Sequence, residues 1–411
     1  MAISARDMTV QNASVRIINP RNVLSIDFLM PVFVMMLVSI GWVTMYSAEP
    51  SDTYAHFYKQ IMFFFAGAAI AAAIISMDYR VLVSLAPAMF VVAVGMLVAV
   101  LFFASVVNGS ERWLVLGPIR IQPSEVTKVV MVYVLAWYLT KLGMRIRRFH
   151  WFAATFLIMA VPMLLILKQP NLGTAACLGP LTLVMLFVAG CRLWHLSLVI
   201  LAGLCVVPFA WYQLHGFDPV EDKPKSATYY EAHPEEMPPP KPFYELYYHQ
   251  KMRIYTFLNP EADPKGGAWQ TIQSKVAVGS GGLSGKGYLK GTQTRLNYLP
   301  EYHTDFIFSH LAEERGFLGG AIVIGLFAAF LLRGLMFARD CPDMMGTLLA
   351  AGIVTILCFH VFVNIAITVG LMPVTGIPLP FLSYGGSFYM TTMACVGILL
   401  SVPMRRRILV R

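Results

Sequence analysis

Ten long apolar runs divide this sequence, and they constrain its fold more than any other feature. They fall near residues 28–48, 59–77, 83–105, 124–140, 152–167, 173–190, 194–214, 306–332, 346–370 and 382–403. A helix crosses the hydrocarbon core of a bilayer in about 20 apolar residues. Charged residues make up only 13% of the chain, about half the share of a soluble domain. The sequence therefore predicts an all-α polytopic membrane protein with about ten transmembrane helices.

Basic residues are unevenly distributed between the two sides that ten spans define. The side with both chain ends has Arg6, Arg16, Arg21, Arg80, Lys141, Arg145, Arg147, Arg148, Arg192, Arg333, Arg339, Arg405, Arg406, Arg407 and Arg411. The short loops on the other side have only Lys59, Arg112, Arg120 and Lys168. Because Lys and Arg concentrate in cytoplasmic loops, both termini are predicted to be cytoplasmic. This topology accounts for the net charge of +9, and we expect no nucleic-acid partner.

The spans organise the chain into three parts. We expect a cytoplasmic tail over 1–27, a transmembrane domain over 28–403 and a basic cytoplasmic tail over 404–411. Within the transmembrane domain, residues 215–304 form a large extracytoplasmic loop between the seventh and eighth helices. The first part of this loop, 216–248, is rich in Pro, Glu and Tyr and is predicted to be an irregular insertion.

The six cysteines give no sign of a disulfide framework or a zinc site. They are Cys177, Cys191, Cys205, Cys341, Cys358 and Cys395, which lie in apolar spans or beside short loops. No pair has the spacing of metal ligands. We expect them to be buried as small hydrophobic residues.

Charged residues near the start of the fourth span form the first candidate site, within residues 109–128. Glu125 and Lys128 are three residues apart and share one helix face. They are either a neutralised internal ion pair or part of the charged lining of a polar cavity. The residues predicted to lie above them are Arg112, Trp113 and Arg120. In the cavity interpretation, the cations would hold a phosphate or diphosphate.

The second candidate site lies where the outer loop becomes the eighth span. Asp305 follows His303 by two residues. Thr304 or Asp305 could cap the helix. Alternatively, Asp305 is a partly desolvated carboxylate with a raised pKa, suited to general-base catalysis. Glu313 and Glu314 lie about two turns deeper, and we expect them to pair with a buried basic group.

The third candidate site is the Pro- and Gly-rich segment 370–387 between the last two spans. Broken backbone at membrane depth is tolerated where it is buried in protein or lines a watery cavity. Asn364, Ser383 and Ser387 would face such a cavity; an ordinary outer turn is the alternative.

Two further patterns are not sites in our interpretation. The glycine-rich stretch 279–287 lacks the spacing of a phosphate-binding loop, and we expect a flexible loop that approaches other backbone closely. His303 and His310 lack a third ligand for a metal.

Six ordered motifs identify a family resemblance. They are QPSE at 122–125, QPNLGTA at 169–175, NPEADP at 259–264, QSKVAVGSGGLSGKGYLKGTQT at 273–294, HTDFIF at 303–308 and PVTGIPLPFLSYGGS at 373–387. Together they resemble the SEDS family (shape, elongation, division and sporulation) over about residues 28–403. The PVTGIPLP version is similar to the rod-shape branch rather than the cell-division branch. The long 216–248 insertion and Arg315 depart from the family pattern.

The resemblance implies a peptidoglycan glycosyltransferase that joins lipid II units into glycan strands and releases undecaprenyl diphosphate, for cell elongation. It implies Asp305 as the essential catalytic carboxylate, which fits the role of general base. It also implies substrate contacts at Arg112, Trp113, Glu125 and Lys128. From their positions in the three candidate sites, we expect further substrate contacts at Arg120, His303, Ser383 and Ser387. A divalent cation, Mg or Mn, is a candidate cofactor. The expected partners are a class B penicillin-binding protein and other membrane proteins of the elongation complex. The expected location is the bacterial cytoplasmic (inner) membrane, with the active site facing outward.

Two other functions fit the same composition. A lipid II flippase would also have ten spans and charges within the membrane. A non-catalytic scaffold of the wall-synthesis complex would need no base at all. The motifs in the outer loop favour the enzyme, because a flippase has no need of a base on the outer side.

Overall fold

The computed structural model describes residues 27–49, 54–103, 105–107, 110–116, 119–169, 171–218, 248–263, 266, 268–296, 298–299 and 301–405. The predicted insertion at 216–248 and both predicted tails lie almost wholly outside the described residues. The long helices are α2 (Leu29–Ala48), α3 (Ala55–Ser76), α5 (Ala86–Phe103), α6 (Pro123–Leu142), α7 (Phe149–Lys168), α8 (Leu172–Val188), α15 (Ile307–Asp340), α16 (Met344–Thr368) and α17 (Gly386–Met404). The shorter ones are α4 (Tyr79–Ser84), α9 (Leu193–Leu204), α10 (Val206–Leu214), α12 (Tyr248–Leu258), α13 (Trp269–Ser280) and α14 (Thr292–Arg295), with 3-10 turns η1 (Gly143–Arg147) and η3 (Pro260–Ala262).

Every predicted span coincides with helical structure. Eight helices in the described part of the chain are long and apolar enough to cross a membrane: α2, α3, α5, α6, α7, α15, α16 and α17. The other two predicted spans correspond to α8 and to α9 with α10, of which α8 and α9 are apolar but shorter. A turn at Cys205 separates α9 from α10. The chain is thus a multi-pass membrane protein, and the count of ten spans stays a prediction.

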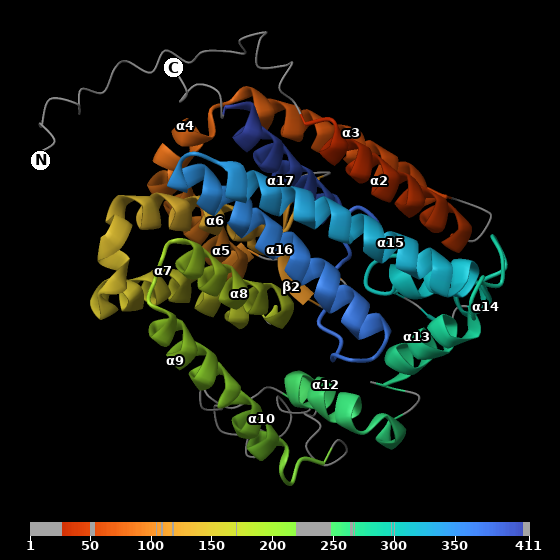
Figure 1. Cartoon of the computed structure of the whole chain (residues 1–411). Coiled ribbons are helices and arrows are strands. Elements are labelled where there is room, and N and C mark those ends of the chain that lie inside the picture. The colour runs from red at the N-terminus through yellow and green to blue at the C-terminus, as the bar shows by residue number, and fades with distance from the viewer. Residues whose placement is uncertain are drawn as a thin grey trace, which may run out of the picture.

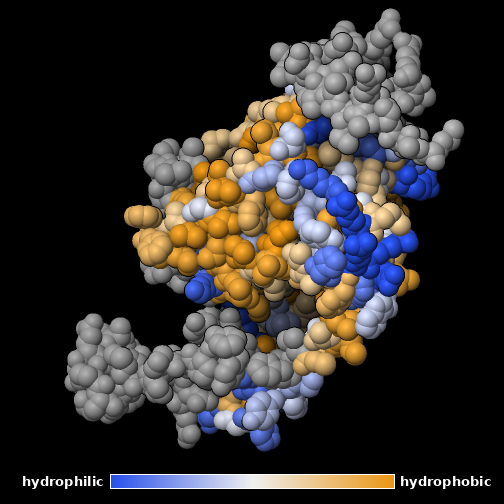
Figure 2. Space-filling view, turned by 90° about the vertical axis from the view of Figure 1, so that its left-hand side faces the viewer, coloured by the Kyte–Doolittle hydropathy of each residue, from blue (hydrophilic) through white to orange (hydrophobic). Residues whose placement is uncertain are grey.

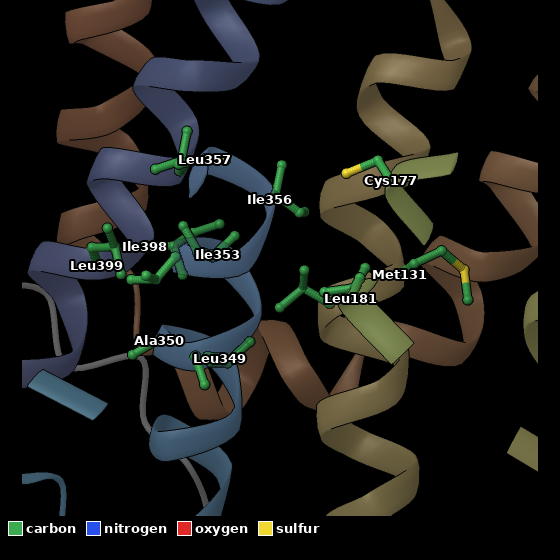
Figure 3. Packing of buried hydrophobic residues seen from close by; sticks show 14 of the residues in the cluster. Met131, Cys177, Leu181, Leu349, Ala350, Ile353, Ile356, Leu357, Ile398 and Leu399 are labelled. Atoms are coloured by element: carbon green, nitrogen blue, oxygen red, sulfur yellow. The ribbon is translucent and has the colours of Figure 1, made fainter. Parts of the chain in front are cut away.

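Helix α16 lies at the centre of the bundle, packed against α15, α17, α6 and α8 (Figure 1). Of its most apolar 18-residue window, 72% is buried, against 17% for α3 at the periphery. Small residues allow this close packing in a membrane. A Cβ atom on Gly352 would lie only 2.7 Å from Val132 of α6. Figure 3 shows the resulting core, where residues of α16 such as Ile353 and Ile356 lie among Met131 and Leu181 on one side and Ile398 on the other.

The outer surface of the bundle is apolar, as a protein in lipid requires. Figure 2 shows a broad hydrophobic face bordered by polar residues. Phe102, Leu157 and Phe362 are among the large apolar side chains exposed on the bundle. Cys205 and Cys358 are also exposed, so the prediction that all six cysteines are buried was wrong for these two. An outward-facing cysteine costs little in an apolar solvent.

A small sheet interrupts the all-α architecture between α5 and α6. Strands β1 (Ser105–Val107), β2 (Ser110–Leu116) and β3 (Ile119–Ile121) pair antiparallel in sequence order. The apolar run that predicted a helix through residue 105 ends as α5 at Phe103. The sheet holds the first candidate site's loop over the end of α5 and against the start of α6.

Both ends of the described chain lie at the same end of the bundle. Asp27, just before α2, forms an ion pair with Arg333 in the last third of α15. Arg405, just after α17, contacts Asp78, and Arg80 contacts Asp343 at the start of α16. This arrangement agrees with the prediction that the two ends share one side of the membrane.

Candidate active site

Asp305 lies in a tight turn, residues 301–306, that leads from the outer loop into α15. The backbone N–H groups of Asp305 and Phe306 donate to the carbonyl of Glu301. Helix α15 begins at Ile307, and the residue before it makes no side-chain capping bond. Neither Thr304 nor Asp305 therefore caps the helix, which removes the structural alternative for Asp305. Its side chain is half-buried.

The turn is held in place by the broken segment between α16 and α17. The Asn364 side-chain amide donates to the Asp305 carbonyl at 2.9 Å and to the Ile377 carbonyl at 2.8 Å. The Ser383 hydroxyl donates to the Thr304 carbonyl at 2.5 Å. These bonds join the second and third candidate sites, which are far apart in sequence, into one. The non-helical backbone between α16 and α17 is thus buried in protein and hydrogen-bonded, as non-helical backbone in a membrane protein must be.

The electrostatic surroundings of Asp305 suit a general base. Burial, with a smaller contribution from the neighbouring Glu301, raises the pKa of its carboxyl to about 6, while Arg253 and Arg112 oppose the rise. A base is most effective when its pKa lies near the working pH. The Asp305 carboxylate can therefore accept a proton and still be ionised in neutral solution.

Two guanidinium groups, those of Arg112 and Arg253, belong to the same site. Burial lowers the pKa of Arg112, and the nearby Arg253 lowers it further. Arg112 is half-buried in β2, and Arg253 is exposed on α12. The sequence motifs did not single out Arg253. Its position six residues before the NPEADP motif is the signal that could have found it.

Glu125 and Lys128 form a closed cluster rather than an open lining. Their charged groups lie 2.9 Å apart, and the Lys128 ammonium is 2.7 Å from Nε2 of His360 on α16. Glu125 and Lys128 are 5% and 2% exposed. This is the arrangement expected of a neutralised internal ion pair. His360 was missed because nothing in the sequence places it opposite α6.

The remaining predicted substrate contacts fall in different surroundings. Trp113 is half-buried in β2 beside Arg112, and Arg120 lies in β3, with its side chain outside the described part. Ser383 and Ser387 are buried, and Ser387 accepts from the backbone N–H of Gln122. Both serines thus hold backbone in place in this structure.

His303 takes part in a cluster of rings beside the Asp305 turn. Its imidazole lies 4.7 Å from that of His56 and 5.8 Å from the Tyr384 ring, measured between centroids. Burial lowers the pKa of His303, and the neighbouring His56 lowers it further. His56 itself is 3.0 Å from a carboxylate oxygen of Glu49. Both effects favour the neutral form of the His303 imidazole.

Glu313 fastens the outer loop to the first turns of α15. Its fully buried carboxylate accepts from the Lys286 ammonium at 2.6 Å, from the Thr292 N–H and hydroxyl at 2.8 Å each, and from the Gln293 N–H at 3.3 Å. The prediction that Glu313 pairs with a basic group is confirmed. The neighbouring Glu314 accepts from the Ser47 hydroxyl of α2 at 2.7 Å, and its other carboxylate oxygen lies 3.7 Å from Nε2 of the buried His310.

The glycine-rich loop bridges a break in α15. Gly316 has φ 67° and ψ −164°, a conformation open to glycine but not to other residues. The backbone N–H of Lys286 in the loop donates to the Glu313 carbonyl, and the Gly282 carbonyl accepts from the backbone N–H of Phe317. A Cβ atom on Gly281 would lie 2.1 Å from the Ala312 carbonyl. The predicted close approach is confirmed.

The described residues do not by themselves form a metal site. No group of three or more His, Cys, Asp or Glu side chains in that part of the chain is close enough to hold an ion. Among the same residues, Glu301 is the acidic neighbour that raises the pKa of Asp305.

Comparison with known proteins places this architecture in a family. A family model described as "Cell cycle protein", covering FtsW, RodA and SpoVE, matches residues 24–408. The chain is 36% identical to peptidoglycan glycosyltransferase MrdB of Escherichia coli K12, over 80% of each chain. It is 34% identical to peptidoglycan glycosyltransferase RodA of Treponema pallidum, over 94% of this chain and 99% of that one.

A solved structure has the same fold. A chain from a structure described as "Structural coordination of polymerization and crosslinking by a peptidoglycan synthase complex" superposes with a TM-score of 0.74 at 30% identity, covering 93% of this chain and 99% of its own. The residues that the family model matches include all six motifs and the Asp305 turn. The chain therefore belongs to the SEDS family, the cell cycle proteins that include FtsW, RodA and SpoVE.

Proposed function

We propose that this protein is a peptidoglycan glycosyltransferase of the rod-shape branch, with Asp305 as its general base. Relatives over most of the chain bear the name peptidoglycan glycosyltransferase. The observation that supports the role of Asp305 is its place in a turn that Asn364 and Ser383 hold, where burial raises the pKa of its carboxyl to about 6. A carboxylate, two guanidinium groups and a membrane-embedded fold suit a reaction on a lipid-linked diphosphate.

The reaction would proceed by direct displacement. The 4-hydroxyl of the acceptor sugar attacks the anomeric carbon of the donor lipid II while Asp305 takes the hydroxyl proton. The new glycosidic C–O bond forms as the bond from that carbon to the diphosphate breaks. The electron pair leaves with undecaprenyl diphosphate. Displacement at an α-linked donor would give a β-linked glycan.

Positive charge at the leaving group is the second requirement. Arg112 and Arg253 can stabilise the departing diphosphate. Lys128 is less suited in this conformation, because Glu125 and His360 surround its ammonium group. A divalent cation, Mg or Mn, would arrive with the diphosphate, since Mg²⁺ commonly binds through substrate phosphates and a few carboxylates.

The topology and the partner belong to the same proposal. The active site would face outward from the bacterial cytoplasmic membrane, where the basic-residue pattern places the Asp305 turn. A class B penicillin-binding protein would crosslink the new strands, alongside other elongation-complex membrane proteins. The similar chain from a structure described as a peptidoglycan synthase complex supports this partnership.

Glycan polymerisation from purified lipid II tests the proposal directly. The wild-type chain and Asp305→Ala would each be assayed with the cognate transpeptidase, and thermal unfolding would confirm that both are folded. We expect polymer from the wild type and none from the variant. Equal polymer from both would place the base elsewhere. No polymer from either, with lipid II translocation intact in vesicles, would favour the flippase.

A further inference from the structure

The glycine-rich loop carries side chains that the proposed reaction does not use. Leu283 is 67% exposed at its tip, and Tyr288 is 37% exposed at its end. Arg315, the residue that departs from the family pattern, is exposed and lies over the Tyr288 ring at 5.2 Å from its centroid. An apolar tip beside a basic and an aromatic residue is an unusual surface for a loop in water.

The depth of this loop follows from helices α2 and α15, which pack against each other. Asp27 pairs with Arg333 at one end of the two helices, and Ser47 donates to Glu314 at the other. Between these contacts α2 has 20 residues, about the length that crosses a hydrocarbon core. Ser47 and Glu314 therefore lie near the boundary of that core, on the Asp305 side of the membrane.

The tip of the loop is fixed at that boundary by backbone bonds. Phe317 donates to the Gly282 carbonyl at 2.8 Å, and Leu318 donates to the Leu283 carbonyl at 3.1 Å. Phe317 and Leu318 are 69% and 52% exposed on α15, on the membrane side of Glu314. Leu283 thus continues the lipid-facing surface of α15.

An aromatic belt marks the same level. Tyr46, beside Ser47 on α2, stacks on Tyr54 with ring centroids 4.6 Å apart. Tyr288 lies at the level of Ser47 and Glu314, because the backbone N–H of the preceding Gly287 donates to the Glu314 carbonyl at 3.0 Å. Tyrosines gather at the level of lipid headgroups because one end of the side chain is apolar and the other polar. Tyr288 and Arg315 therefore lie where lipid phosphates are found.

We propose that the glycine-rich loop, residues 279–289, is a membrane-interface element. Leu283 enters the acyl region of the leaflet on the Asp305 side, and Arg315, stacked on Tyr288, binds the phosphate of a phospholipid in that leaflet. A guanidinium group is well suited to a phosphate, and its apolar stem can lie along lipid.

This contact would set the height of the Asp305 turn relative to the membrane. Glu313 ties the loop to the first turns of α15, which follow that turn directly. The break at Gly316 separates these first turns from the rest of the helix. A lipid-linked substrate has its reactive diphosphate at headgroup level. Anchoring the loop there would hold the two at matching depths.

Fluorescence quenching in nanodiscs tests the depth of Leu283 without requiring activity. Cys205, Cys341 and Cys358 would be replaced by Ala, and an environment-sensitive probe attached at Leu283→Cys. Phe317→Cys serves as the lipid-facing control, and Glu261→Cys, exposed in η3, as the control in the outer loop. We expect spin-labelled lipid to quench the Leu283 probe at least about half as strongly as the Phe317 probe. Weaker quenching by lipid, with aqueous iodide acting as on the Glu261 probe, would overturn the proposal.

Lipid binding by Arg315 is tested on the full chain in detergent. Phosphatidylglycerol would be titrated and bound lipid counted by native mass spectrometry. We expect Arg315→Gln to weaken binding about fivefold. The matched control Arg295→Gln, exposed on nearby α14, should bind as the wild type does. Equal binding by both variants, or displacement of the lipid by millimolar inorganic phosphate, would overturn the phospholipid site. Neither assay depends on glycan synthesis, so its failure is separable from failure of the proposed function.

Discussion

Asp305 and Glu313 are two carboxylates that bracket the same short stretch of α15, yet their surroundings are opposite. Glu313 is fully buried and accepts hydrogen bonds from an ammonium group, a hydroxyl and two backbone N–H groups. Asp305 is half-buried, and the Asn364 side-chain amide donates to its backbone carbonyl rather than to its carboxylate. One carboxylate is saturated with donors, and the other keeps the capacity to take a proton.

The difference separates two uses of charge at the edge of a membrane. A buried charge must be paired or hydrogen-bonded, since leaving it alone costs several kcal/mol. Glu313 meets this requirement and fixes the loop. Asp305 meets it only in part, and burial consequently raises the pKa of its carboxyl to about 6. A charged side chain that lacks a full set of hydrogen-bond partners, on a backbone that is rigidly held, is a feature of functional sites.

The largest expected contrast between the two residues is in catalysis. Asp305→Asn should lower the rate of glycan polymerisation by about 10²–10⁴-fold, because general-base assistance is worth that much. Glu313→Gln should lower it less than about tenfold, because the amide oxygen of the substituted side chain would still accept some of the same bonds. The measurement is polymer formed from lipid II per folded protein. Equal losses in both variants would erase the distinction between the two carboxylates.

Stability should show the reverse order. Glu313→Gln weakens four hydrogen bonds and leaves the Lys286 ammonium without its carboxylate, so we expect a loss of about 3 kcal/mol in the free energy of unfolding. Thermal unfolding in detergent would measure the change as a lower Tm. Glu261→Gln, at an exposed position in η3, should change stability by less than about 0.5 kcal/mol. An unchanged Tm for Glu313→Gln would contradict the fastening role.

Because the pKa of Asp305 is raised, replacing its carboxyl by a neutral group should increase the free energy of unfolding by an amount that depends on pH. A carboxyl whose pKa rises on folding from 3.8 to about 6 is disfavoured as an ion in the folded state. That cost is small below about pH 4, grows as pH rises, and is complete above about pH 7. The full shift corresponds to about 3 kcal/mol, which partial exposure of the side chain to solvent reduces. Asp305→Asn should thus exceed the wild type in stability by about 1 to 2 kcal/mol at neutral pH and by little in acid. Tm measured across this range would check it, and a constant difference would count against the raised pKa.

The smallest expected effect concerns Arg253. Its charge opposes the rise in the pKa of Asp305, so Arg253→Gln should raise that pKa and move the acid limb of the pH–rate profile upward. Because Arg253 is exposed, we expect a shift of about half a pH unit and a fall in kcat/KM of about two- to fivefold, on the order of 1 kcal/mol. Lys251→Gln on the same helix is the control. An acid limb that stays in place would remove Arg253 from the site.

Much of the fold could be predicted from the sequence, because lipid imposes a simple rule. A run of about 20 apolar residues must become a helix that satisfies its own backbone. Every predicted span is helical, and the motif over 303–308 singled out the segment that contains Asp305. The runs did not reveal the sheet over 105–121, because short strands between spans lack a strong apolar period. Nor did they reveal the break in α15 at Gly316, since the predicted span 306–332 runs through it without a proline or a turn signal strong enough to divide it.

The sequence alone thus determined the membrane class, the positions of the spans and the residue Asp305 as the candidate base. The tertiary structure decided what surrounds each charge. It closed Lys128 between Glu125 and His360 and placed Arg253 within electrostatic range of Asp305. It also joined residues 301–306 to the Asn364 side chain and to the broken segment before α17. Charge placement depends on contacts between distant segments, and apolar periodicity carries no information about which helices become neighbours.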